Sequence, residues 1–193
     1  MLQRLYNWTM DLAGHRHAVW ALFFIALIES SFFLVPPDVL LIPIILAAQN
    51  RAWLVAGICT LGSVIGGILG YGIGMFAFDA IGRPILDMYH ALAKFEEMRG
   101  LYNEHGALIV FSAGFSPIPY KVFTIASGVA DMNIITFTIA SIFGRGARFF
   151  LIAALLWKFG EPIKTFVEGN LAKLTFAFVI LFAIGVFALK TML

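Results

Sequence analysis

The sequence predicts an all-α integral membrane protein built from two inverted repeats, each a re-entrant hairpin followed by one transmembrane helix. Apolar residues make up 61% of the 193 residues and charged residues 12%, about half the charged share of a soluble domain. The apolar residues also form long runs, and prolines next to charged residues interrupt two of them. We therefore expect a single membrane domain over residues 1–193, with an interfacial N-terminal helix and an extra C-terminal span.

Residues 1–17 mix aromatic and aliphatic side chains with charged ones. This mixture predicts a short helix at the membrane interface, with Tyr6 and Trp8 at the level of the headgroups. A frayed polar terminus is the alternative. The apolar run that follows, from Ala18 to about Ala48, is too long for the hydrophobic region of a cleaved signal peptide.

The first repeat is predicted over residues 18–78, and its apolar run contains Glu29, Pro36, Pro37 and Asp38. Proline removes a backbone donor and clashes with the preceding turn, so one straight helix is not expected here. Broken backbone at membrane depth is tolerated where protein or a wet cavity surrounds it. We therefore predict two arms, 18–34 and 38–49, joined at a tip that contains both prolines.

A transmembrane span is predicted at 52–78, and glycines recur in it every four residues. They lie on one helix face, which allows a second backbone to approach closely. We interpret the face as a packing seam, and a sliding seam is the alternative. Its members are Gly62, Gly66, Gly70 and Gly74.

Residues 79–105 carry the densest charge in the chain, with apolar residues at helical spacing between the charges. We predict an amphipathic connector outside the membrane. Its two histidines, His90 and His105, are fifteen residues apart without evident ligand partners, so a solvated face is favoured over a metal site.

The second repeat, predicted over residues 106–157, follows the plan of the first. Residues 106–130 form the second hairpin candidate, with Pro117 and Pro119 at its break and Lys121 beside it. Asp131 and Asn133 are expected to mark the exit from this hairpin and to cap the next helix, a span at 134–157. Residues 172–190 are predicted to form a plain apolar span that faces lipid.

The two halves are expected to enter the membrane from opposite sides. If each hairpin returns to its own side, one crossing separates the halves, and the second is inverted relative to the first. Many secondary transporters have this plan, with the binding site where broken segments meet near the membrane midplane.

Five ionisable residues lie within the apolar segments: Glu29, Asp38, Lys121, Arg145 and Arg148. A charged side chain costs about 2.5–3.5 kcal/mol at the bilayer centre, so such residues usually face a cavity or a partner. Glu29 and Asp38 are our candidates for proton coupling. Lys121, Arg145 and Arg148 are candidates for binding an anionic substrate, because arginine suits forked recognition of phosphate. Ion pairs that only hold the two halves together are the alternative.

Over roughly residues 18–157 the sequence resembles the DedA family, within the superfamily of VTT-domain or SNARE-associated Golgi proteins, and most closely its YqaA-type branch. Three features carry the resemblance: Glu29 followed by Pro36-Pro37-Asp38, the glycine-rich span, and GFSPIPYK at 114–121. The resemblance implies two re-entrant loops, dependence on the proton-motive force and lipid translocation in the bacterial inner membrane. Family members are linked to undecaprenyl phosphate recycling or phosphatidylethanolamine flipping.

By position, Glu29 and Asp38 match the acidic pair of the family. The second hairpin of the family carries Arg-x-x-Pro followed by another arginine. This sequence departs from that pattern: Gly114 stands at the first arginine, and Lys121 roughly replaces the second. Arg145 and Arg148, on the next helix, are candidates to compensate.

We therefore predict a proton-coupled transporter or lipid flippase that moves a phospholipid or polyprenyl-phosphate headgroup. A membrane scaffold without transport is the main alternative. An intramembrane enzyme is less favoured, because the histidines lie outside or at the edges of the apolar cores and no His-Glu-x-x-His motif exists. We expect membrane lipids and protons as partners, with no nucleic acid, metal or cofactor, and the sequence leaves a homo-oligomer open.

Overall fold

The computed structural model describes residues 18–31, 36–78, 80, 92–116, 119–160 and 162. Every secondary-structure element in these residues is a helix, which confirms the all-α prediction for this part of the chain. Several predictions lie outside the described residues: the interfacial helix at 1–17, the C-terminal span at 172–190, Pro117 and much of the connector.

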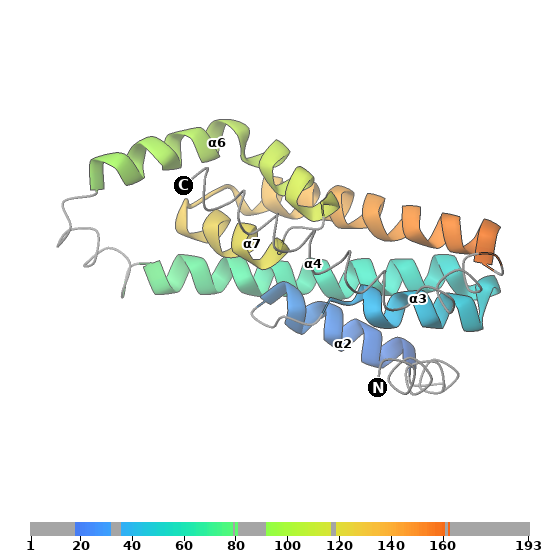
Figure 1. Ribbon diagram of the computed structural model, residues 1–193. Coiled ribbons are helices and arrows are strands. Elements are labelled where there is room, and N and C mark those ends of the chain that lie inside the picture. Colours follow the sequence, from blue (N-terminus) through green and yellow to red (C-terminus); the bar gives the residue numbers. More distant parts are fainter. Residues whose placement is uncertain are drawn as a thin grey trace, which may run out of the picture.

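Two short helices, α2 (Ala18–Ser31) and α3 (Asp38–Ala47), correspond to the arms of the first predicted hairpin (Figure 1). At 1.5 Å per residue, their 14 and 10 residues are about 21 and 15 Å long. The hydrocarbon core of a bilayer is about 30 Å thick, so the described residues of each helix are too few to cross it. α3 begins directly after Pro37, whose φ of −65° suits the start of a helix.

Two long apolar helices are long enough to cross a membrane. The first combines the short 3-10 helix η1 (Gln49–Arg51) with α4 (Ala52–Ala77) into 29 helical residues. The second, Ile134–Gly160, has 27 residues. Each is about 40 Å long, which exceeds the hydrocarbon core. They lie where the sequence predicted spans, at 52–78 and 134–157.

The boundary predicted between the connector and the second hairpin, at residue 105, falls inside one helix. A single helix, α6 (Leu92–Phe115), runs through it for 24 residues. The predicted boundary followed a change from charged to apolar composition, but no proline lies there to end a helix. α6 ends shortly before Pro117, because the residue before a proline disfavours helical backbone.

The two halves of the fold share one spacing. α3 and α7 (Tyr120–Val129) each have 10 residues and start at 38 and 120, which are 82 residues apart. α4 and the Ile134–Gly160 helix start at 52 and 134, also 82 residues apart. In Figure 1 these two long helices run in opposite directions, and the two hairpins extend toward each other from opposite ends. Equivalent positions in the two halves therefore differ by 82.

The glycine face of α4 packs against both hairpins. A Cβ atom added at Gly62 or Gly66 would meet the backbone of α2, at Phe23 and Leu27 respectively. Toward the other end of α4, a Cβ atom at Gly74 would meet the backbone of α7. Only glycine allows backbones to approach this closely, so this face fixes how α2 and α7 lie on α4.

The junction between α7 and the second long helix is held by side chains. Asn133 Oδ1 accepts hydrogen bonds from the backbone N–H groups of Ile135 and Thr136, at 3.0 and 3.1 Å, so the predicted helix cap is confirmed. Asp131 has a φ of 56° and pairs with Arg99 of α6 at 2.9 Å. These contacts fix the start of the helix that carries Arg145 and Arg148.

Candidate functional site

Glu29 and Arg145 form a buried ion pair between the two halves of the chain. Glu29 lies in the last turn of α2, and Arg145 lies near the middle of the Ile134–Gly160 helix. Arg145 Nη2 is 3.2 Å from Glu29 Oε2, and only 4% of the arginine side chain and 12% of the glutamate side chain are exposed. Buried charges cost several kcal/mol unless they are paired, so each residue compensates the charge of the other.

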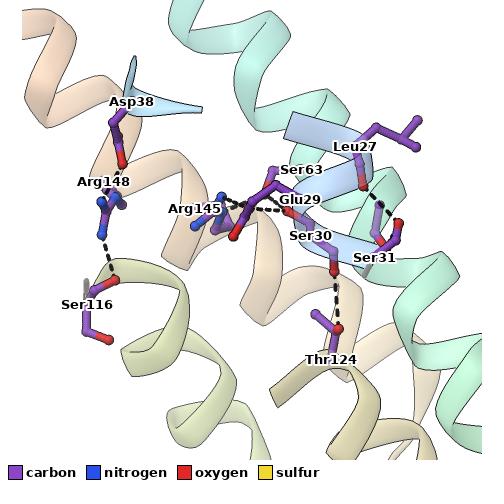
Figure 2. A network of polar contacts seen from close by, with 11 residues as sticks. Leu27, Glu29, Ser30, Ser31, Asp38, Ser63, Ser116, Thr124, Arg145 and Arg148 are labelled. Carbon is purple, nitrogen blue, oxygen red and sulfur yellow. Dashed lines mark hydrogen bonds and ion pairs between the residues drawn. The ribbon is translucent and has the colours of Figure 1, made fainter. Parts of the chain in front are cut away.

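Two buried serines connect the same ion pair by a second route. Ser63 on α4 accepts a hydrogen bond from Arg145 Nε at 2.5 Å, and its Oγ lies 2.7 Å from Oγ of Ser30 on α2. Ser30 donates in turn to Glu29 Oε2 at 3.2 Å (Figure 2). Arginine can only donate and an ionised carboxylate can only accept, so the chain of hydrogen bonds runs from Arg145 to Glu29.

Two aromatic rings hold the Arg145 guanidinium from other directions. Its Cζ lies 5.0 Å from the ring centroid of Tyr120 and 4.6 Å from that of Phe149. Both rings are fully buried, and a cation over an aromatic face is most stabilising where water is excluded. The Tyr120 hydroxyl donates a hydrogen bond to Ser141 on the same helix as Arg145. Arg145 is therefore fixed by an anion, a hydroxyl group and two rings.

Asp38 and Arg148 form a second ion pair, which joins the tips of both hairpins. Arg148 Nη2 lies 2.7 Å from Asp38 Oδ2, at the start of α3, with side-chain exposures of 18% and 16%. Arg148 Nη1 donates to the backbone oxygen of Ser116, just after α6, at 2.6 Å (Figure 2). Within the described residues, Asp38 Oδ1 and Arg148 Nε are buried without a hydrogen-bond partner. The hydrogen-bonding capacity of this pair is therefore not fully used within the described residues.

Lys121 completes the set of five intramembrane charges. It lies in the first turn of α7, is half-buried, and is close enough for its charge to act on the Glu29 carboxylate. Pro119 directly precedes α7, as Pro37 directly precedes α3. The structure thus gathers the predicted acids and bases in one region, with three bases against two acids.

Sequence reasoning missed Ser63, although a signal for it exists. Ser63 and Arg145 are 82 residues apart, which is the spacing of the two halves. An alignment of the halves with this offset puts a serine opposite a buried arginine at the centre of the two long helices. Ser30 and the rings of Tyr120 and Phe149 gave no such signal, because serine and aromatic residues are common in apolar helices.

Comparisons with known proteins agree with this architecture. The VTT domain family model matches residues 35–158, which is well over half of the chain. An uncharacterized protein of Haemophilus influenzae is 39% identical over 186 residues, covering 96% of both chains. An uncharacterized protein of Histophilus somni is 36% identical over 168 residues, covering 85% of this chain and 87% of its own.

No solved structure matches the chain. The family model spans α3, α4, α6, α7 and nearly all of the second long helix, which together contain both hairpin tips and both long apolar helices. The chain therefore belongs to the VTT-domain family of membrane proteins, within the DedA/SNARE-associated superfamily.

Proposed function

We propose that this protein couples proton binding to the movement of an anionic lipid headgroup across the bacterial inner membrane. The observation that carries the proposal is the double ion pair within the membrane-spanning region: Glu29 with Arg145, and Asp38 with Arg148. Both acids come from the first hairpin and both arginines from one long helix of the other half. The opposite directions and equal spacing of the halves support an inverted repeat with its site at the centre.

Protonation of Glu29 or Asp38 would change its ion pair from a closed to an open state. When a carboxylate takes a proton it loses its charge, and its attraction to the arginine falls to that of a neutral hydrogen bond. The Nη2 group of the released arginine is then free to donate to a phosphate group. Proton binding and anion binding therefore favour the same opened state, which is the requirement for coupling them.

The charge balance also favours an anion. Among the five described residues Lys121, Arg145, Arg148, Glu29 and Asp38 there are three positive charges and two negative ones, an excess of one positive charge within the set, in a region of low dielectric constant. Protonation of one carboxylate raises the excess to two. A phosphate headgroup carries one or two negative charges and would neutralise the site.

A membrane scaffold is the second candidate, and one observation favours it. Both arginines are occupied by carboxylates, and Arg148 also binds the Ser116 carbonyl, so the residues join the two halves as they stand. In this role the pairs would stabilise the fold and never open. The two candidates predict different results when charge is removed without loss of volume.

The test is a headgroup-resolved flipping assay in proteoliposomes with an imposed pH gradient. Lipids labelled at the headgroup, one a phosphodiester and one a polyprenyl monophosphate, would be tested separately. We expect gradient-dependent movement with the wild type and at least a tenfold loss with Glu29→Gln or Asp38→Asn, because neither amide can take up a proton and release it.

Asp131→Asn is the matched control, since it neutralises a carboxylate that pairs with Arg99 at 2.9 Å but lies on the exposed junction. It should keep wild-type movement. If the wild type moves neither lipid, transport of these headgroups is refuted. If Glu29→Gln and Asp38→Asn move lipid as fast as the wild type while stability falls, the scaffold role replaces the transport role.

A further inference from the structure

The more buried of the two ion pairs is also the longer one. Arg145 and Glu29 are separated by 3.2 Å, whereas the more exposed Arg148 and Asp38 are separated by 2.7 Å. Burial alone would favour the opposite order, because charges attract more strongly where water is excluded. A contact within the protein, rather than exposure to water, therefore holds Arg145 away from the Glu29 carboxylate.

Ser63 provides the restraint. It takes the Nε–H of Arg145 at 2.5 Å, so Nε is not available to Glu29, which Nη2 contacts at 3.2 Å. An arginine that used Nε and Nη2 together would form a forked pair with the carboxylate, which is shorter and stronger than a single contact. The rings of Tyr120 and Phe149 also contact the guanidinium, with their centroids 5.0 and 4.6 Å from its Cζ atom.

The place of this contact in the repeat is a second, independent observation. Ser63 and Arg145 are 82 residues apart, so they occupy equivalent positions in the two halves and touch each other. A contact between equivalent positions lies on the axis that relates the halves. If the two halves exchanged conformations, this contact would again join the same two positions. The Glu29–Arg145 contact, between positions 116 apart, would not be restored in this way.

We propose that Ser63 is a positioning residue that holds Arg145 on the axis between the halves and prevents the forked pair that Nε and Nη2 together would form with Glu29. The inference rests on the proposed function, in which this pair must open in every cycle. Ser63 keeps its contact with Arg145 while Glu29 takes and loses a proton. The serine thereby keeps the arginine at the membrane centre. It also keeps the Glu29–Arg145 ion pair weak enough to open.

Replacing Ser63 and replacing Ser30 should shift the protonation of Glu29 in opposite directions, although the two serines share one hydrogen bond. Ser63→Ala frees Arg145 Nε to turn to Glu29, which favours the ionised carboxylate, so Glu29 is protonated at lower pH. Ser30→Ala removes a hydrogen bond donated to the carboxylate, which favours the neutral acid, so Glu29 is protonated at higher pH. Each shift should be about one pH unit, the size of one hydrogen bond to a charged group.

The measurement is labelling of Glu29 by a hydrophobic carbodiimide, which reacts with protonated carboxyl groups, followed by mass spectrometry across a pH series. Other titratable groups near Glu29 are Asp38 of α3, Cys59 of α4, and Tyr120 and Lys121 of α7. They are unchanged in every variant and contribute equally. Ser31→Ala is the matched control, because Ser31 is a neighbouring buried serine that bonds only backbone oxygens.

Opposite shifts for Ser63→Ala and Ser30→Ala, with Ser31→Ala at the wild-type midpoint, support the positioning role. A Ser63→Ala midpoint equal to that of the wild type, or shifted in the direction of Ser30→Ala, overturns it. Where Ser63→Ala does not fold, Ser63→Cys replaces it, with a smaller shift in the same direction because a thiol is a weaker acceptor. Labelling needs no transport, so a wild type that moves no lipid refutes the proposed function and leaves this test intact.

Discussion

Replacing Gly66 by alanine should separate the first hairpin from the long helix that supports it. Gly66 lies on α4 where α2 crosses it, and it is buried. A Cβ atom at this position would lie 2.8 Å from the Leu27 carbonyl carbon, 2.9 Å from Leu27 Cα, and closest of all to the Leu27 carbonyl oxygen. These atoms are backbone, so no side-chain rotation can relieve the clash.

The size of the effect follows from these distances. Non-bonded carbon atoms rest about 3.5 Å apart or more, so α2 must move away by roughly 1 Å to admit the methyl group. The Glu29–Arg145 distance, 3.2 Å in the structure, would then approach about 4 Å, which is too long for a hydrogen bond. Overpacking of this kind typically costs about 1–3 kcal/mol.

Gly72→Ala is the matched control on the same helix, because a Cβ atom there meets nothing within 4 Å. Alanine in an open helical position should be neutral or stabilise by up to about 1 kcal/mol. Thermal unfolding in detergent, followed by intrinsic tryptophan fluorescence, should show a lower midpoint for Gly66→Ala alone. The carbodiimide profile of Glu29 should also change for Gly66→Ala alone. Equal midpoints and profiles for the two variants would refute the packing argument.

Two further predictions test single contacts. Arg148→Lys keeps the charge but loses the fork that binds Asp38 and the Ser116 carbonyl together, so proton-driven lipid movement should fall on the order of tenfold in the proteoliposome assay. Wild-type movement in that variant would show that charge alone suffices. Asn133→Ala removes a helix cap at a cost of about 1 kcal/mol and should lower the unfolding midpoint by about 2–4 °C, with lipid movement unchanged. An unchanged midpoint would mean that the cap contributes nothing.

Most of the helices could be predicted from the properties of residues that are close together in the sequence. Pro36 and Pro37 lie directly before α3 in the structure, as expected for two consecutive residues that lack a backbone donor, although Pro43 is accommodated inside that helix. Asn133 caps its helix through a contact only two or three residues away. At residue 105 the change from charged to apolar side chains alters what surrounds α6 and does not end the helix.

The sequence predicted which residues belong to the candidate site but not which of them contact each other. Charge inside an apolar run marks a residue that needs a partner, which selected Glu29, Asp38, Arg145 and Arg148. Nothing in the sequence assigned Glu29 to Arg145 rather than to Arg148. Ser63 was also out of reach without the spacing of the halves, since a buried serine has no distinguishing pattern.

The sequence by itself determined that the chain is apolar enough for a membrane, and which charged residues and prolines interrupt its apolar segments. These properties depend on composition and on backbone chemistry within a few residues. Only the tertiary structure decided which acid pairs with which arginine and that a serine stands between them. Those contacts join residues 82 to 116 positions apart, and they depend on how closely the glycine face of α4 lets α2 and α7 approach.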